Sequence, residues 1–220
     1  MNEQPPTSQT PGDRVKMRSK AVQTRSRERV DLLLTTAEAL LLEGGMDGLK
    51  MRELARRAGL PIASVYHYFP SNGSVIRALA ERHLEALRVV IAREMRAVMA
   101  QQIEISARPA TARILTANFV AHLIKTPASA HIWDGLRFRP DLRQLDLEDT
   151  GVNARFLETY MRWVVPALPD DMVADQTLLL VEAIQANILI VLHSPLEKQE
   201  TLTTALGEMA TATLRGLQLR

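Results

Sequence analysis

The sequence predicts an all-α protein made of a small N-terminal helix-turn-helix domain and a larger C-terminal helical domain. Apolar residues recur at helical spacing through most of the chain. Residues 51–69, MRELARRAGLPIASVYHYF, have the pattern of two short helices that cross at a tight turn. Prolines and paired glycines stand near the ends of the helical runs, where they stop helices. We place the boundary between the two domains between residues 71 and 72.

The composition excludes several classes of protein. The 220 residues are enough for one large or two modest domains with a core. Because there is no cysteine, disulfides, thiolate metal sites and a cysteine nucleophile are excluded, and we expect the protein in the reducing cytoplasm. No apolar run reaches membrane-spanning length, so we expect no membrane partner. A net charge of +2, from 27 basic and 25 acidic residues, excludes a general polyanion binder.

Residues 1–24 are predicted to be a disordered basic arm. The first twelve residues contain three prolines and a glycine among polar side chains, with almost nothing to bury. Between residues 14 and 27 there are six basic residues and no acidic ones. Such an arm can lie along phosphates or in the minor groove of DNA, or it can be a solvated tail that keeps the protein soluble.

Residues 25–71 are predicted to form a three-helix domain. Its first helix runs from about Arg25 to Glu43 with an apolar stripe on one side, and the glycine pair at 44–45 ends it. In the helix-turn-helix that follows, Ala55 is small enough for two helices to cross closely. Gly59 adopts the left-handed conformation of the turn, and Val65 fills the gap between the helices.

The spacing of this motif assigns roles on DNA. The second helix of a helix-turn-helix lies in the major groove, while the first crosses the phosphate backbone. Eight residues are candidates for DNA binding. Ile62, Ala63 and His67 are expected at base edges, Lys50, Arg52, Ser64 and Tyr66 at phosphates, and Asn72 is a further candidate. Arg56 and Arg57 lie on the backbone side. Two alternatives stay open, because a helical hairpin in any bundle has a similar pattern and the Tyr66 ring can pack in the motif's own core.

The run from Val30 to Leu79 resembles the N-terminal DNA-binding domain of the tetracycline-repressor (TetR) family of bacterial transcription regulators. The features that match are Gly44-Gly45, Leu49, the Arg52-Glu53-Leu54-Ala55 segment, Ala58-Gly59 and the run from Tyr66 to Ser71. The sequence departs from the family pattern at Lys50, where Thr or Ser is usual, at Tyr68, where His is commonest, and at Asn72-Gly73, where Lys-Glu is usual. The lysine missing at Asn72 is a phosphate contact in the family, and Lys50 can supply part of its charge.

Residues 72–220 are predicted to form a helical effector-binding and dimerisation domain. Ser71 caps a long helix that extends to about Ile103, some 45 Å at about 1.5 Å per residue. In the family that the sequence resembles, this helix transmits ligand binding to the DNA-binding heads. Five further helices are expected at 110–125, 128–138, 152–165, 171–194 and 195–217. The charged segment 139–149, which contains Pro140, is predicted to be a loop or a frayed turn.

Aromatic and amide side chains in this domain are candidates for a ligand cavity between helices. They are Phe119, His122, Trp133, Phe138, Tyr160, Trp163, Gln185 and Asn187. The alternative for each is an ordinary place in the core. Glu182, Gln185 and Asn187 are polar residues in an otherwise apolar helix, and buried polar groups need partners. These three therefore either bond across a dimer or meet an effector.

The last two helices are predicted to form a homodimer interface. Residues 178–192 are apolar on nearly every side, so the helix must be covered on two sides. The final helix carries a matching apolar stripe, and two copies of the pair would make a four-helix interface. The alternative is a bundle core within one chain.

Nothing in the sequence indicates catalysis, a metal site or a cofactor. There is no HExxH motif, no glycine-rich phosphate loop and no GxSxG elbow. The resemblance implies a ligand-responsive regulator, a repressor in preference to an activator. It would bind a palindromic double-stranded DNA operator as a homodimer and be released by a small-molecule effector whose identity is unknown. The alternative is a helical ligand-binding or protein-interaction module whose helix-turn-helix is structural.

Overall fold

The computed structural model describes residues 11–126 and 128–219, and every element that these residues form is helical. This confirms the all-α prediction. The elements are α1 (Pro11–Gly48), α2 (Met51–Ala58), α3 (Ile62–Tyr68), α4 (Asn72–Met99), the 3-10 helix η1 (Ile105–Ala110), α5 (Thr111–Lys125), α6 (Ser129–Phe138), α7 (Pro140–Val164), α8 (Asp170–Leu192) and α9 (Leu196–Gln218).

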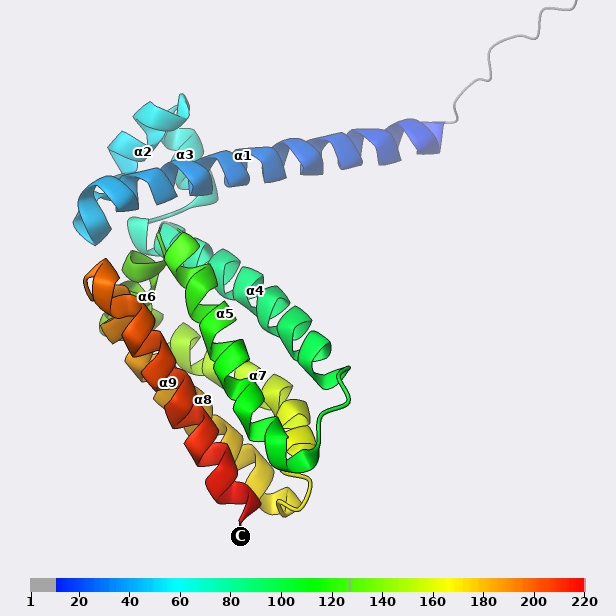
Figure 1. The fold of residues 1–220 in the computed structure, drawn as a ribbon. Coiled ribbons are helices and arrows are strands. Elements are labelled where there is room, and N and C mark those ends of the chain that lie inside the picture. Colours follow the sequence, from blue (N-terminus) through cyan, green and yellow to red (C-terminus); the bar gives the residue numbers. More distant parts are fainter. Residues whose placement is uncertain (1–10, 127, 220) are drawn as a thin grey trace, which may run out of the picture.

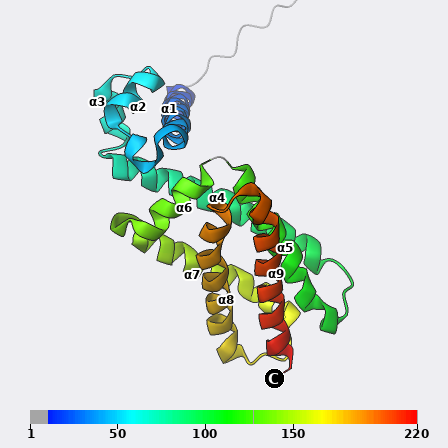
Figure 2. The ribbon, with the colours of Figure 1, turned by 60° about the vertical axis from the view of Figure 1, so that its left-hand side comes forward.

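The helices form a small head and a larger bundle (Figures 1 and 2). The head consists of α1, α2 and α3, and α1 projects well beyond it (Figure 1). Helix α4 begins at the head and runs along the bundle, in which α8 and α9 lie side by side. The C-terminal end of the chain lies at the end of the bundle far from the head (Figure 1). Helix α4 thus connects the head to the bundle.

Helix α1 is longer than the sequence pattern predicted. We expected disorder through residue 24 and a helix from about Arg25, whereas the described helix begins at Pro11; residues 1–10 lie outside the described residues. Residues 13–24 contain no glycine or proline and are rich in good helix formers, and proline is tolerated in a first helical turn. The regular helix is interrupted at the predicted glycine pair, because Gly45 has the non-helical angles φ 59° and ψ −158°, and a short helical segment follows to Gly48.

The helix-turn-helix has the predicted geometry. Gly59 ends α2 in the left-handed conformation, with φ 64° and ψ 29°, and the N–H of Leu60 donates to the carbonyl oxygen of Ala55 at 3.0 Å. Ala55 and Val65 are buried between the two helices. The prediction that Ser71 caps the next helix is also confirmed, because its hydroxyl accepts the N–H of Ser74 at 3.2 Å.

The core of the head is continuous with two helices of the bundle. Buried leucines of α1 and α4 belong to one apolar cluster with Ile132 and Leu136 of α6 and Leu142 of α7. Gly135 leaves room for the Met46 side chain, because a β-carbon at position 135 would clash with the Met46 methyl carbon. The boundary that we placed between residues 71 and 72 stays a prediction, and this shared core shows that the head packs directly on α6.

Residues 140–149 form the first part of α7, so the prediction of a loop there is wrong. Pro140 stands at the first position of the helix, where a backbone N–H has no partner within the helix and proline's lack of one therefore costs nothing. Leu142 and Leu145 are buried against the head, and Asp146 is buried beside Arg143, whose guanidinium donates to it at 3.1 Å. The charged residues of this segment thus belong to a packed helix.

Helix α8 is the one helix of the described residues that is long and apolar enough to cross a membrane, judged by length and composition alone. This differs from our expectation that no run has that length. One such helix is weak evidence, because a helix in the core of a bundle passes the same test. Val173, Val181 and Ile188 are buried within the chain, whereas Leu179 and Ile190 are more than half exposed.

Candidate nucleic-acid interface and ligand cavity

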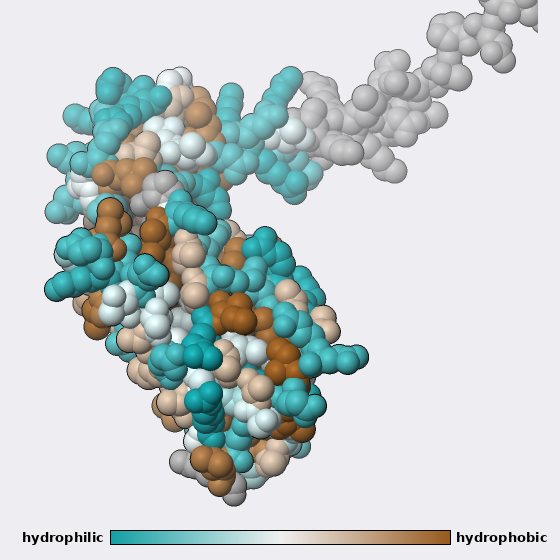
Figure 3. Space-filling model, in the orientation of Figure 1, coloured by the Kyte–Doolittle hydropathy of each residue, from teal (hydrophilic) through white to brown (hydrophobic). Residues whose placement is uncertain are grey.

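The two faces of α3 have opposite environments. Val65 is buried in the head, whereas Ile62, Ala63 and His67 are exposed. Tyr66 is 48% exposed, so its ring does not pack in the core of the motif, and Ser64 is partly buried. Hydrophilic side chains cover much of the upper surface of the head (Figure 3). The outer face of α3 is thus free to contact a partner.

A shallow groove beside α3 brings together four of the residues predicted to bind DNA. Lys50, Arg52, Tyr66 and Asn72 line it, together with residues 70 and 71. Within the described residues, Lys50 and Arg52 have no acidic partner, and Lys50 makes no side-chain cap to α2. Two unpaired cations next to an exposed tyrosine and an amide are suited to hydrogen bonds with phosphate oxygens.

Arg56 and Arg57, by contrast, are held by acidic residues of the head. Both donate to Glu53, with Nε to oxygen distances of 2.8 Å, and Arg57 also donates to Glu43 at 2.6 Å. These bonds lower the pKa of Glu53 to about 2, with the bond from Arg56 as the largest cause. The cations at 56 and 57 are therefore partly neutralised, which leaves Lys50 and Arg52 as the stronger candidates for phosphate.

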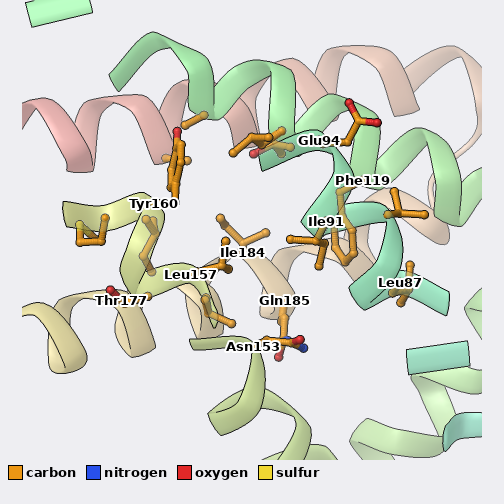
Figure 4. Close-up of a pocket in the computed structure, with 18 of the residues that line it drawn as sticks. Leu87, Ile91, Glu94, Phe119, Asn153, Leu157, Tyr160, Thr177, Ile184 and Gln185 are labelled. Carbon is orange, nitrogen blue, oxygen red and sulfur yellow. The ribbon is translucent and has the colours of Figure 1, made fainter. Parts of the chain in front are cut away.

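The bundle contains an apolar cavity between α4, α5, α7, α8 and α9 (Figure 4). Its volume is about 110 Å³, and most of the residues that line it are apolar. Four of the residues predicted to contact a ligand line it, namely Phe119, Trp133, Tyr160 and Gln185. The Tyr160 hydroxyl is already bonded to Thr111 at 2.8 Å, and burial raises the pKa of Tyr160 to about 12.

The other four predicted ligand residues do not line this cavity. Phe138 is 73% exposed at the end of α6. The ring of Trp163 lies under the Arg108 guanidinium, whose central carbon is 4.7 Å from the ring centroid. The Asn187 amide donates to the carbonyl oxygen of Ala183 in its own helix. His122 lies near His83 of α4 and is not among the residues that line the cavity. A ligand role for these four has no support from the geometry.

Part of the cavity wall is polar, and the sequence analysis did not identify most of it. Asp149 and Asn153 of α7 both line the cavity, and the Asn153 amide donates to an Asp149 oxygen at 2.7 Å. The other Asp149 oxygen accepts from Arg88 of α4. On α8, Gln185 accepts from the Thr150 hydroxyl at 2.9 Å. The spacing of Asp149 and Asn153, four residues apart, would have been a signal had residues 139–149 been recognised as helical.

The polar residues of α8 have separate partners. Gln185 is buried and bonds to α7, as described above. Glu182 instead lies 3.6 Å from Arg137 of α6, and Asn187 bonds within α8. We expected these three residues either to bond across a dimer or to meet an effector; of the three, Gln185 is the one that reaches the cavity. No group of metal-binding side chains was found among the described residues.

Lowering the pH is expected to destabilise the fold through His83 of α4. Its ring is buried, and its Nε2 has no partner among the described residues. Burial, with a smaller effect of His122, lowers the pKa of His83 from 6.5 to about 4. The pKa of His83 is lower in the folded protein than in the unfolded chain, so the unfolded chain takes up a proton first as the pH falls. The folded state therefore has its full stability above pH 6.5 and loses stability as the pH falls from 6.5 toward 4. Between pH 7.5 and 5.5 the loss is about 1.4 kcal/mol.

Urea unfolding at these two pH values measures the effect of His83. The variant His83→Leu should lose about 1.4 kcal/mol less than the wild type over the same interval. The exposed His67 supplies a matched control, since His67→Leu should keep the wild-type dependence. An unchanged pH dependence in His83→Leu would contradict the assignment.

The chain therefore combines an exposed helix-turn-helix head, a long connecting helix and a helical bundle with an internal cavity. Residues 33–79 match the family described as bacterial regulatory proteins, tetR family. This match covers α2, α3 and parts of α1 and α4, so the head of the chain is similar to that family.

Known proteins resemble this chain in sequence over the head and in fold over most of its length. The chain is 43% identical over 54 residues, 24% of its length, to the HTH-type transcriptional repressor NemR of Escherichia coli K12, and it matches 27% of that repressor. A transcriptional regulator from Rhodococcus sp. Rha1 has a TM-score of 0.61 at 18% identity, covering 86% of this chain and 97% of that one. The structure of RolR in complex with resorcinol has a TM-score of 0.58 at 17% identity, and the match covers 90% of this chain and 96% of RolR. At these identities the structural likeness shows the fold.

Proposed function

We propose that this protein is a ligand-responsive transcriptional regulator, a repressor in preference to an activator, that binds a palindromic DNA operator as a homodimer. The observation that carries the proposal is the outer surface of the head. It combines the exposed face of α3 with the unpaired cations Lys50 and Arg52 at its edge. A helix presented in this way can enter a major groove while flanking cations contact the phosphates.

On DNA, each candidate residue of the head has a proposed role that follows from its chemistry. Ile62 and Ala63 are small or apolar side chains that can meet thymine methyl groups, and His67 can hydrogen-bond a base edge. Lys50, Arg52, Ser64, Tyr66 and Asn72 are proposed to contact the sugar-phosphate backbone. Two heads of a dimer would occupy half-sites roughly 34 to 36 Å apart, or a multiple of one helical turn.

The proposed dimer forms through α8 and α9. Both helices expose apolar side chains, among them Leu178, Leu179 and Ile190 of α8 and Met209 of α9. Exposed apolar surface of this kind is characteristic of interaction sites. Gly207 and Ala210 of α9 are buried, and Gly207 packs against Arg113 of α5. These small residues of α9 thus allow α5 of the same chain to pack closely. The exposed apolar residues of α8 and α9 are proposed to supply the contact between chains.

A small molecule in the bundle cavity is proposed to release the operator. The cavity is lined by five residues of α4, the helix that begins at the head. A ligand shifts the population toward the conformation that it binds more tightly, so binding beside α4 can favour a head spacing that does not match the operator. RolR, which is similar in fold, forms a complex with resorcinol, and this supports an effector of small size.

A gel-shift titration tests the proposal. Purified protein is titrated against the DNA immediately upstream of its own gene and against a scrambled duplex, at two salt concentrations. We expect tight binding of the upstream duplex, two chains for each duplex, and an affinity that falls as salt rises because phosphate contacts release counterions. Where the upstream duplex is not preferred, selection from random sequences identifies the operator.

The alternative, a helical module with a structural helix-turn-helix, gives the opposite result. It predicts equal and weak binding to both duplexes and no preferred sequence after selection. The exposure of Tyr66 favours the regulator over this alternative, since a structural motif would bury the aromatic ring.

A further inference from the structure

We infer that the cavity binds an uncharged compound the size of a single ring, whose hydroxyl or primary amide group bonds to Asn153 and Gln185. This deepens the proposed function, because it names the class of ligand for the proposed effector site. The volume of about 110 Å³ is comparable to the roughly 150 Å³ of an engineered apolar cavity that takes up benzene. Leu87, Ile91 and Ile184 form part of the apolar wall that a ring would contact.

Asn153 offers a hydrogen-bond acceptor to the cavity. Its side-chain Nδ2 donates to Asp149, so the orientation of the amide is determined, because an ionised carboxylate can only accept. The Oδ1 atom that remains is buried and has no partner among the described residues. A buried polar atom of this kind costs about 1–3 kcal/mol if it stays unpaired. A ligand that donates a hydrogen bond would remove that cost.

Gln185 offers the complementary group at the same end of the cavity. Its Oε1 accepts from Thr150, and its Nε2 has no partner within the described part of the chain. The Thr150 hydroxyl can donate or accept, so either orientation of the Gln185 amide leaves one end unpaired. Figure 4 shows the side chains of Asn153 and Gln185 next to each other, from α7 and α8. A hydroxyl or a primary amide both donates and accepts, so one such group can bond to both.

The charges around the cavity exclude anions. Two carboxylates line it, Glu94 and Asp149, and no lysine, arginine or histidine of the described residues does. Glu94 is occupied by Arg93 and by the Asn118 amide, and Asp149 by Arg88 and Asn153. An entering carboxylate or phosphate would lose its hydration without gaining a cation, which is costly in an apolar site. The Trp133 indole N–H, buried without a partner in the described structure, adds a second neutral donor to the wall.

Two matched pairs of probes test the ligand class by isothermal titration calorimetry of the full chain without DNA. Phenol and toluene have the same size and differ in the hydroxyl, while benzamide and benzoate have the same size and differ in charge. We expect phenol to bind at least tenfold more tightly than toluene, about 1.4 kcal/mol, and benzamide at least tenfold more tightly than benzoate.

A double variant then tests the residues that hold the polar group. Gln185→Met with Thr150→Val removes both partners of one hydrogen bond and nearly conserves volume, so neither group is left unpaired. We expect the ratio of phenol to toluene affinity to fall severalfold while toluene binding is kept. Gln144→Met, on the exposed side of α7, is the matched control and should keep the wild-type ratio.

Several results would overturn the inference, and the probe series on the wild-type chain is decisive even if the double variant does not fold. Equal affinity for phenol and toluene would exclude a hydrogen bond from the ligand to Asn153 and Gln185. Tighter binding of benzoate than of benzamide would exclude the inference that the ligand is uncharged. No binding by any of the four probes at millimolar concentration would exclude a ring-sized site. Since no DNA is present, these results are independent of the gel-shift test of the regulator.

Discussion

Replacing Lys50 and Arg52 together with alanine is expected to lower operator affinity about a hundredfold while the fold is kept. Each side chain is exposed, has no acidic partner in the described structure, and lines the groove beside α3. A charge-assisted hydrogen bond to phosphate contributes about 1.5 kcal/mol, and two of them account for about two orders of magnitude. Exposed positions without partners change stability by less than about 0.5 kcal/mol, so the loss would be specific to binding.

Fluorescence anisotropy at a series of salt concentrations measures this effect. Because phosphate contacts carry no sequence information, the slope of log affinity against log salt should fall by about two, and the preference among operator variants should stay. The double variant Lys125→Ala with Arg155→Ala removes the same charge from exposed positions of the bundle and serves as the control. Equal affinities of the two double variants would show that the groove does not contact DNA.

The head was predictable because its determinants are local in sequence. The small residue at Ala55, the glycine at 59 and the apolar residue at Val65 are each required by a tight crossing of two consecutive helices, and all three have the expected environment. The exposure of Tyr66 was not predictable, because an amphipathic aromatic side chain suits either face of a short helix. Its position depends on how α3 is rotated against α2, which no local pattern specifies.

The bundle was less predictable, for two physical reasons. Pro140 suggests a loop because proline breaks helices, but proline also favours the first position of a helix, and Pro140 is the first residue of α7. The cavity candidates were chosen by residue type, whereas the rotation of each helix decides which side chains face inward. Phe138 and Tyr160 are both aromatic, but one is exposed at a helix end and the other lines the cavity.

The polar wall of the cavity also depends on contacts between distant parts of the chain. Asn153 bonds to Asp149, and Asp149 bonds to Arg88 of α4, which precedes Asp149 by 61 residues. No spacing rule connects these positions, and the pairing exists only because α4 and α7 are packed together. These two hydrogen bonds also connect Asn153, the proposed ligand contact, to α4, the helix that begins at the head.

Replacing Arg88 with leucine is expected to destabilise the protein by about 3 kcal/mol at neutral pH. Asp149 is buried, and Arg88 and Asn153 are its hydrogen-bond partners. Removing one partner of a buried ion pair costs roughly 3–5 kcal/mol, because the remaining charge is left without compensation. We use the lower end of that range, since the Arg88 side chain is 31% exposed and Asn153 still donates to the carboxylate.

Urea unfolding of a double-mutant cycle measures this pair. Asp149→Asn in the Arg88→Leu background removes the uncompensated charge and should restore most of the lost stability. Burial already raises the pKa of Asp149, and the loss of Arg88 raises that pKa further. A carboxyl with a raised folded pKa favours the fold when protonated, so the deficit of Arg88→Leu should be complete at pH 7.5 and shrink as the pH falls through that pKa. A deficit independent of pH, or one that Asp149→Asn does not relieve, would show that Arg88 contributes by packing alone.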